Sequence, residues 1–86
     1  MSVISVQFSV YPLDGRDMVP IIECIESELV ARKRPFQVGA MSTMLWGDSR
    51  VVFAALEVIF ALVAAEGAVV MNVTASNCCP LPENET

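Results

Sequence analysis

The sequence contains no histidine, the side chain that most often serves as a general base near neutral pH. This absence excludes every catalytic triad that depends on an imidazole, and it removes the usual nitrogen ligand of zinc. Ser42 and Thr43 are possible nucleophiles by residue type, but the nearest lysine is Lys33 and no activating base is apparent. We therefore expect a protein that is not an enzyme, in which these hydroxyls pair within a strand or bind a ligand.

Basic residues are also scarce, with five Lys and Arg against ten Asp and Glu and a formal net charge of −5. Four of the five cations fall at residues 32–34 and 50, so no long basic stripe is available for nucleic acid, and we expect no such partner. An acidic protein suits a cationic small ligand, although acidity of this size commonly serves solubility alone.

The three cysteines do not form a disulfide framework, because their number is odd and Cys78 and Cys79 are adjacent. Metal and thioredoxin-type motifs need a C-x-x-C spacing or a second ligand cluster, which are missing. Cys24 falls on a predicted helix, where it serves as a small hydrophobic residue. The first residues lack the features of a signal peptide. We expect a cytoplasmic protein with no metal site and no cofactor.

The longest apolar stretch, residues 51–73, has the length of a membrane span but not its composition. Glu57 and Glu66 lie inside it and Gly67 interrupts it. Each carboxylate at the centre of a span costs about 2.5 to 3.5 kcal/mol on insertion scales. A buried helix that ends at the glycine and is followed by a strand accounts for this stretch better.

At 86 residues the chain forms one small domain, and a domain of this size buries only about 60% of the surface of its unfolded chain. Yet 55% of the residues are hydrophobic, which is more than one such globule can easily hide. This surplus predicts an oligomer, or packing against a partner domain.

Hydrophobic periodicity predicts the order β-α-β-β-α-β. Strands are expected at residues 3–11, 36–40, 41–46 and 69–76, with a bend at Gly39. A first helix is expected from a cap at Asp17 to Arg34, and a second from Asp48 or Ser49 to about Glu66. Residues 81–86 are expected to form a mobile acidic tail.

The two helices each show a stripe of apolar residues at helical spacing. The first has Met18, Ile22, Ile25 and Leu29 toward the core, with Glu23, Glu26 and Glu28 toward solvent. The second has Val52, Leu56, Ile59, Phe60 and Val63 toward the core.

This order of elements is typical of the ferredoxin-like α+β sandwich, an antiparallel four-stranded sheet with both helices on one face. In the usual strand order 4-1-3-2, the first and last strands are neighbours. Their polar positions would then share the face opposite the helices: Ser5, Gln7, Ser9, Tyr11, Asn72, Thr74 and Ser76. Such a face is often simply solvated, but its amides and hydroxyls can also bind the edge of a heterocycle.

Five segments together resemble one known family. They are QFSVYPL at residues 7–13, MST at 41–43, GD at 47–48, VFAAL at 52–56 and VMNVTASNCCP at 70–80. The chain resembles, from about residue 3 to residue 80, the YkoF-like family of proteins that bind thiamine or its hydroxymethylpyrimidine part.

The resemblance implies a single ferredoxin-like domain over residues 1–80 and non-enzymatic binding of ligand in thiamine salvage or supply. It also implies oligomers built through the sheets, here a homodimer or homotetramer in place of the two domains that some family members carry in one chain. Carried over by motif, the implied ligand-binding residues are Gln7, Ser9, Tyr11, Ser42, Thr43, Asn72, Thr74 and Ser76. Two positions depart from the family pattern. Ala68 replaces a frequent histidine before the Val-Val-Met-Asn run, and Trp46 replaces a frequently polar residue before Gly47.

Two other functions compete with ligand binding. A structural or regulatory module could use the polar sheet face to bind a partner protein, although such interfaces usually centre on aromatic residues and arginine. A small enzyme of the dimeric α+β-barrel type also uses paired ferredoxin-like units, but the missing histidine counts against it.

Overall fold

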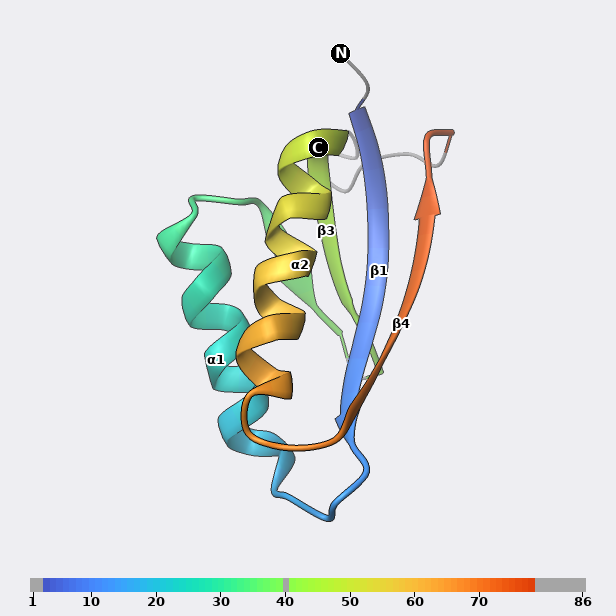
Figure 1. Ribbon diagram of the computed structural model, residues 1–86. Helices are drawn as coiled ribbons and strands as arrows, with labels where there is room; N and C mark the ends of the chain where they lie inside the picture. Colours follow the sequence, from blue (N-terminus) through green and yellow to red (C-terminus); the bar gives the residue numbers. More distant parts are fainter. Residues whose placement is uncertain (1–2, 40, 79–86) are drawn as a thin grey trace.

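Six elements follow one another in the predicted order in the computed structural model, which describes residues 3–39 and 41–78 (Figure 1). They are β1 (Val3–Pro12), α1 (Met18–Ala31), β2 (Phe36–Val38), β3 (Thr43–Asp48), α2 (Ser49–Ala64) and β4 (Val69–Ser76). The predicted tail at residues 81–86, the end of the predicted strand at residue 40 and Cys79 lie outside the described residues.

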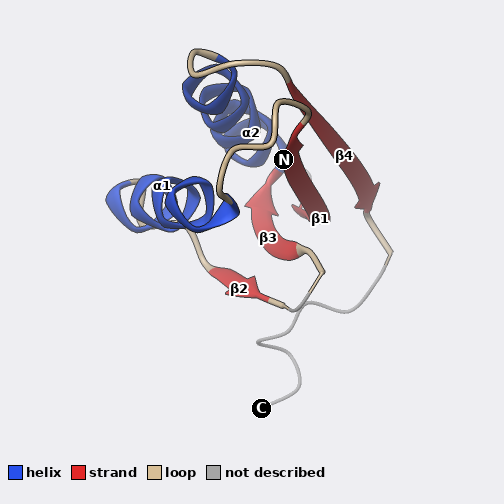
Figure 2. Ribbon diagram, turned by 90° about the horizontal axis from the view of Figure 1, so that it is seen from below, coloured by secondary structure: helices blue, strands red, loops and turns tan. Residues whose placement is uncertain are grey.

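The sheet is antiparallel throughout and has the order β2-β3-β1-β4, which is the predicted order read from the other edge. Both helices cover one face of the sheet and leave the other face open (Figure 2). The chain is therefore a ferredoxin-like α+β sandwich. None of the helices in the described part of the chain is long and apolar enough to cross a membrane.

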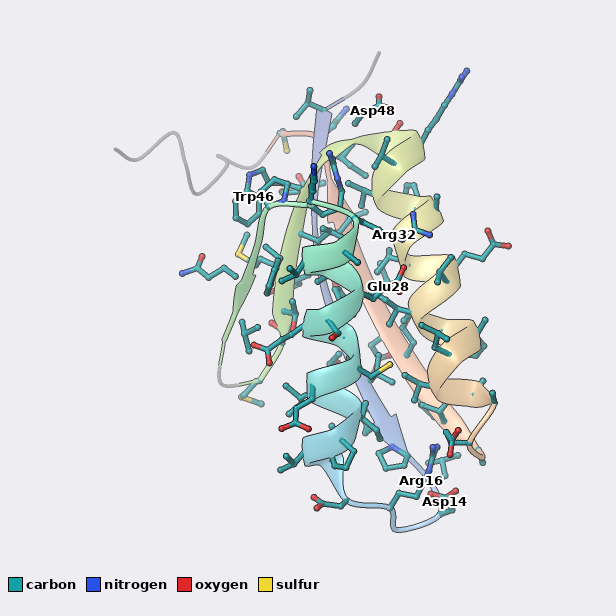
Figure 3. The ribbon with its side chains drawn as sticks, turned by 90° about the vertical axis from the view of Figure 1, so that its left-hand side faces the viewer. Asp14, Arg16, Glu28, Arg32, Trp46 and Asp48 are labelled. Carbon is teal, nitrogen blue, oxygen red and sulfur yellow. The ribbon has the colours of Figure 1, made fainter. Side chains whose placement is uncertain are left out.

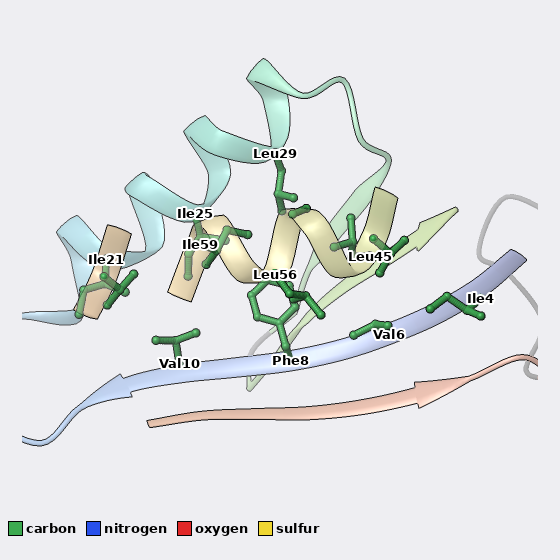
Figure 4. Close-up of a cluster of buried hydrophobic side chains, with 13 residues drawn as sticks. Ile4, Val6, Phe8, Val10, Ile21, Ile25, Leu29, Leu45, Leu56 and Ile59 are labelled. Atoms are coloured by element: carbon green, nitrogen blue, oxygen red, sulfur yellow. The ribbon is translucent and has the colours of Figure 1, made fainter. Parts of the chain in front are cut away.

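The core lies between the helices and the sheet, and the inward row of β1 forms its floor (Figure 4). As the alternation predicts, Ile4, Val6, Phe8 and Val10 are all buried. Leu45 of β3 and the inner stripes of both helices complete the cluster, which includes Ile25, Leu29, Val52, Leu56, Ile59 and Val63.

Two predicted core positions were wrong. Ile22 is 39% exposed and Phe60 is 42% exposed, whereas Ile21 and Ala55 are buried. Consecutive residues on a helix are about 100° apart around its axis, so the residue next to a core position can face outward. Ile21, Ile25 and Leu29 follow at intervals of four and fix the buried stripe of α1.

The first helix begins at a true cap and ends earlier than predicted. The Asp17 side chain accepts a hydrogen bond from the Val19 backbone N–H at 3.1 Å. At the other end Lys33 has a φ of 56°, and the Arg34 N–H donates a hydrogen bond to the Leu29 carbonyl at 3.0 Å. The left-handed backbone at Lys33 ends α1 at Ala31. The basic cluster at residues 32–34, which the sequence pattern placed within the helix, therefore follows it.

Arg16 ties the β1–α1 connection to the end of α2. Its Nε bonds the Asp14 carboxylate at 2.9 Å, and its two terminal nitrogens donate to the Val63 and Ala68 carbonyls at 3.3 Å (Figure 3). The side-chain hydrogen bond from Arg16 is the main reason that the pKa of Asp14 lies below its ordinary value.

Candidate functional site

The polar positions of β1 and β4 share the open face of the sheet, as expected. The register places Ser5 opposite Ser76, Gln7 opposite Thr74, and Ser9 opposite Asn72. The Asn72 amide donates a hydrogen bond to the Tyr11 hydroxyl. Gln7, Tyr11, Asn72 and Thr74 are exposed, whereas Ser9 and Ser76 are half-buried. Six of the eight predicted site residues are therefore gathered on one face.

Thr43 does not belong to that face. It lies directly opposite Phe8, whose side chain is in the core, so Thr43 faces the helices. The face of a strand residue is set by register with a period of two. Gln7 and Asn72 therefore lie on the opposite face of the sheet from Thr43.

Instead, Ser42 and Thr43 line a cavity of about 110 Å³ on the helix side of the sheet, and Ser9 also contributes to its lining. The cavity lies between α1, the middle of β1, and the connection from β2 to β3. Its apolar wall includes Phe8, Val10, Met18, Ile22, Ile25, Val38 and Met41. Among the described residues, Glu26 is the one charged side chain that lines it. A mostly apolar wall with a few polar groups is typical of small-molecule sites.

Helical spacing brings the α1 residues to the cavity. Met18, Ile22 and Glu26 are four residues apart and lie along one side of the helix. The sequence pattern placed Glu26 in solvent, but it is half-buried. Glu26 lies four residues after Ile22, an apolar residue that was expected in the core. This spacing is the signal that could have identified Glu26 as a cavity residue.

The β2–β3 connection and the start of β3 bring Ser42 and Thr43 to the cavity. The Gly39 N–H donates to the Ser42 carbonyl at 2.8 Å. A Cβ at residue 39 would lie only 3.0 Å from that oxygen, so glycine permits the close approach. Met41 is 90% exposed and lies at the rim.

A second, wider groove of about 520 Å³ runs between the start of α1 and the end of α2. Arg16, Asp17, Cys24 and Glu66 are among its lining residues. Arg16 is already bonded to Asp14 and to two backbone carbonyls, and the Asp17 carboxylate caps α1. These polar groups hold the fold together, so we favour the smaller cavity as the candidate site.

Nothing in the described part of the chain resembles a metal centre, since no group of three or more Cys, Asp or Glu side chains is suitably placed there. Cys24 is half-buried on α1. Cys78 is exposed after β4, where its N–H donates to the Ser76 hydroxyl at 3.1 Å.

Several solved structures share the fold over nearly the whole chain. A hypothetical protein of Methanocaldococcus jannaschii superposes with a TM-score of 0.85 at 18% identity, covering 99% of this chain and 93% of its own. A Streptococcus pneumoniae protein gives a TM-score of 0.83 at 22% identity, covering 96% and 94%.

A third similar structure is from Thermotoga maritima, a protein for which a role in thiamine biosynthesis or salvage has been suggested. Its TM-score is 0.79 at 11% identity, covering 96% of this chain and 94% of that one. At these identities the similarity concerns the fold. No curated protein sequence matches the chain. The model of the YKOF-related family matches residues 3–82, and the chain therefore belongs to the YKOF-related family.

Proposed function

We propose that the chain binds the pyrimidine half of thiamine, either as free hydroxymethylpyrimidine or within thiamine, and catalyses no reaction. Membership of the YKOF-related family and the fold shared with the Thermotoga maritima protein support a thiamine-related role. In this proposal the chain acts in thiamine salvage or supply in the cytoplasm and needs no metal or cofactor.

The observation that carries the proposal is the size and chemistry of the cavity between α1 and the sheet. An apolar cavity of about 150 Å³ holds one benzene molecule. The cavity here is smaller, at about 110 Å³, but it is open at its rim, so a six-membered ring can enter it with its larger substituents toward the rim. The apolar wall, with Phe8 and Ile25, suits the faces of such a ring.

The polar groups at the cavity match the edge of an aminopyrimidine. The exocyclic amino group is a donor, and the Glu26 carboxylate is an acceptor. The ring nitrogens are acceptors, and the hydroxyls of Ser42 and Thr43 can donate to them. The thiazolium half of thiamine would remain toward the rim, near the exposed Met41.

A second candidate is a protein-interaction module that uses the open face of the sheet. Trp46 of β3 lies opposite Ser5, and it is only 7% exposed with no hydrogen-bond partner for its indole N–H among the described residues. A buried donor without an acceptor is costly, so this side chain would be stabilised if it turned outward and donated to an acceptor of a partner.

Calorimetric titration with hydroxymethylpyrimidine and with thiamine tests the proposal. Thr43→Val keeps the size of the side chain and removes the hydroxyl, and a neutral hydrogen bond contributes about 0.5 to 1.5 kcal/mol. We expect a loss of affinity of about two- to twelvefold. Thr74→Val on the open face is the matched control and should bind like wild type. If folded wild type binds neither ligand, the interaction module becomes the better interpretation.

A further inference from the structure

We propose that the cavity between α1 and the sheet selects its ligand by charge, and that Glu26 makes it reject phosphate esters. This inference rests on the proposed function, since it concerns which form of the pyrimidine binds. The selected ligand class is an uncharged or cationic aminopyrimidine whose hydroxymethyl group carries no phosphate.

The first step of the argument is the absence of a cation where a phosphate would have to sit. Among the described residues that line the cavity, Glu26 is charged and no lysine or arginine is present. Phosphate sites usually pair the anion with arginine, lysine or free backbone N–H groups.

The second step is that the cations of the chain lie away from the cavity. Arg16 is bonded to Asp14 and to the Val63 and Ala68 carbonyls, and Arg32 pairs with Glu28 at 2.7 Å. Residues 33 and 34 follow the end of α1, whereas the α1 residues that line the cavity lie between Met18 and Glu26. Arg50 is in the first turn of α2, and that helix contributes no residue to the cavity wall.

The third step concerns the start of α1, which is the nearest source of positive potential. A helix N-terminus attracts anions through its free N–H groups. Here the Asp17 carboxylate already accepts from the Val19 N–H, so this end carries its own negative charge.

A phosphate monoester carries a charge of about −1.5 to −2 at pH 7. Beside the Glu26 carboxylate, and without a compensating cation, this charge is repelled. For unit charges about 8 Å apart at an effective dielectric constant of about 20, the repulsion lowers affinity about thirtyfold, or about 2 kcal/mol. The same carboxylate favours the unphosphorylated aminopyrimidine.

The experiment is calorimetric titration of the full chain with hydroxymethylpyrimidine and with its phosphate monoester. Three proteins are compared: wild type, Glu26→Gln and Glu23→Gln. The two variants change the net charge equally, but Glu23 is exposed and does not line the cavity. Thermal melts confirm that each variant is folded.

We expect wild type and Glu23→Gln to prefer the free pyrimidine by at least about tenfold, and Glu26→Gln to lose most of that preference. Equal or tighter binding of the ester by wild type would overturn the inference and leave the proposed function standing. A preference that Glu23→Gln reduces as much as Glu26→Gln would overturn the role given to Glu26. If wild type binds neither compound, the proposed function fails and the inference fails with it.

Discussion

Gly67 stands where the chain passes from α2 into β4, in a backbone conformation that favours glycine. Its φ is 150°, and a Cβ built there would overlap the Asp14 carboxylate that Arg16 holds in place. The residue thus accommodates both an unusual backbone angle and a close neighbour.

We predict that Gly67→Ala destabilises the protein by more than about 1 kcal/mol, measured by urea denaturation. Gly15→Ala is the control, because Gly15 also has a positive φ of 79° but no described atom lies within 4 Å of the place that a Cβ would take there. The overlap should make Gly67→Ala the more damaging change. Equal losses in the two variants would mean that backbone strain alone matters.

At the site, some residues could be placed from the sequence and others could not. The alternation of β1 was sufficient to place Ser9 on the open face and Phe8 in the core. The face of Thr43 could not be predicted, because β3 begins two residues later than the sequence suggested and its side follows from pairing with Phe8. Glu26 was predicted in solvent because a carboxylate usually lies there, although its helical position points to the cavity.

At the scale of elements, the two helices begin in different ways although both have aspartate at the N-cap. Asp17 accepts a hydrogen bond from Val19, whereas Asp48 makes no side-chain capping bond in the described structure. The sequence alone does not distinguish the two positions, because composition does not reveal the orientation of the capping side chain.

We predict that Asp17→Ala lowers the free energy of unfolding by about 1 kcal/mol, within the range of about 0.5 to 2 kcal/mol for lost caps. Asp48→Ala should cost less, because it removes no capping bond. Urea denaturation of both variants measures the difference. A larger loss in Asp48→Ala would show that α2 depends on its cap more than α1 does.

The order and type of all six elements followed from periodicity and from turn residues. The pairing of β1 with β4 followed from the usual strand order of this fold. Their ends were less predictable. The basic cluster after α1 has the composition of a helix end, yet the left-handed backbone at Lys33 terminates the helix before it. Such local backbone choices depend on tertiary packing as well as on residue type.

At the scale of the whole molecule, β4 is an edge strand of eight residues with no charge or proline. Unprotected edges of this kind favour pairing with another chain. Exposed apolar residues lie on β4 and the neighbouring α2, with Val73 42% and Phe53 49% exposed. Together these features suggest that the edge is covered by a second copy.

We predict that light scattering at micromolar concentration gives a mass of at least twice the 9.3 kDa of one chain. Val73→Lys should shift the protein toward monomer, because it places a charge among the exposed apolar residues that β4 and α2 share. Val30→Lys, at an exposed position on α1, is the control and should leave the mass unchanged. A wild-type mass equal to that of one chain would contradict the prediction.

The binding of a pyrimidine ring between α1 and the sheet can be mapped by NMR titration of the ¹⁵N-labelled protein with hydroxymethylpyrimidine. We expect the largest amide shifts at Ile25, Glu26 and Thr43, which line the cavity. Asn72 and Thr74 on the open face should shift little. Shifts concentrated at Asn72 and Thr74, with Glu26 and Thr43 unchanged, would contradict the proposed site and move the ligand to the open face of the sheet.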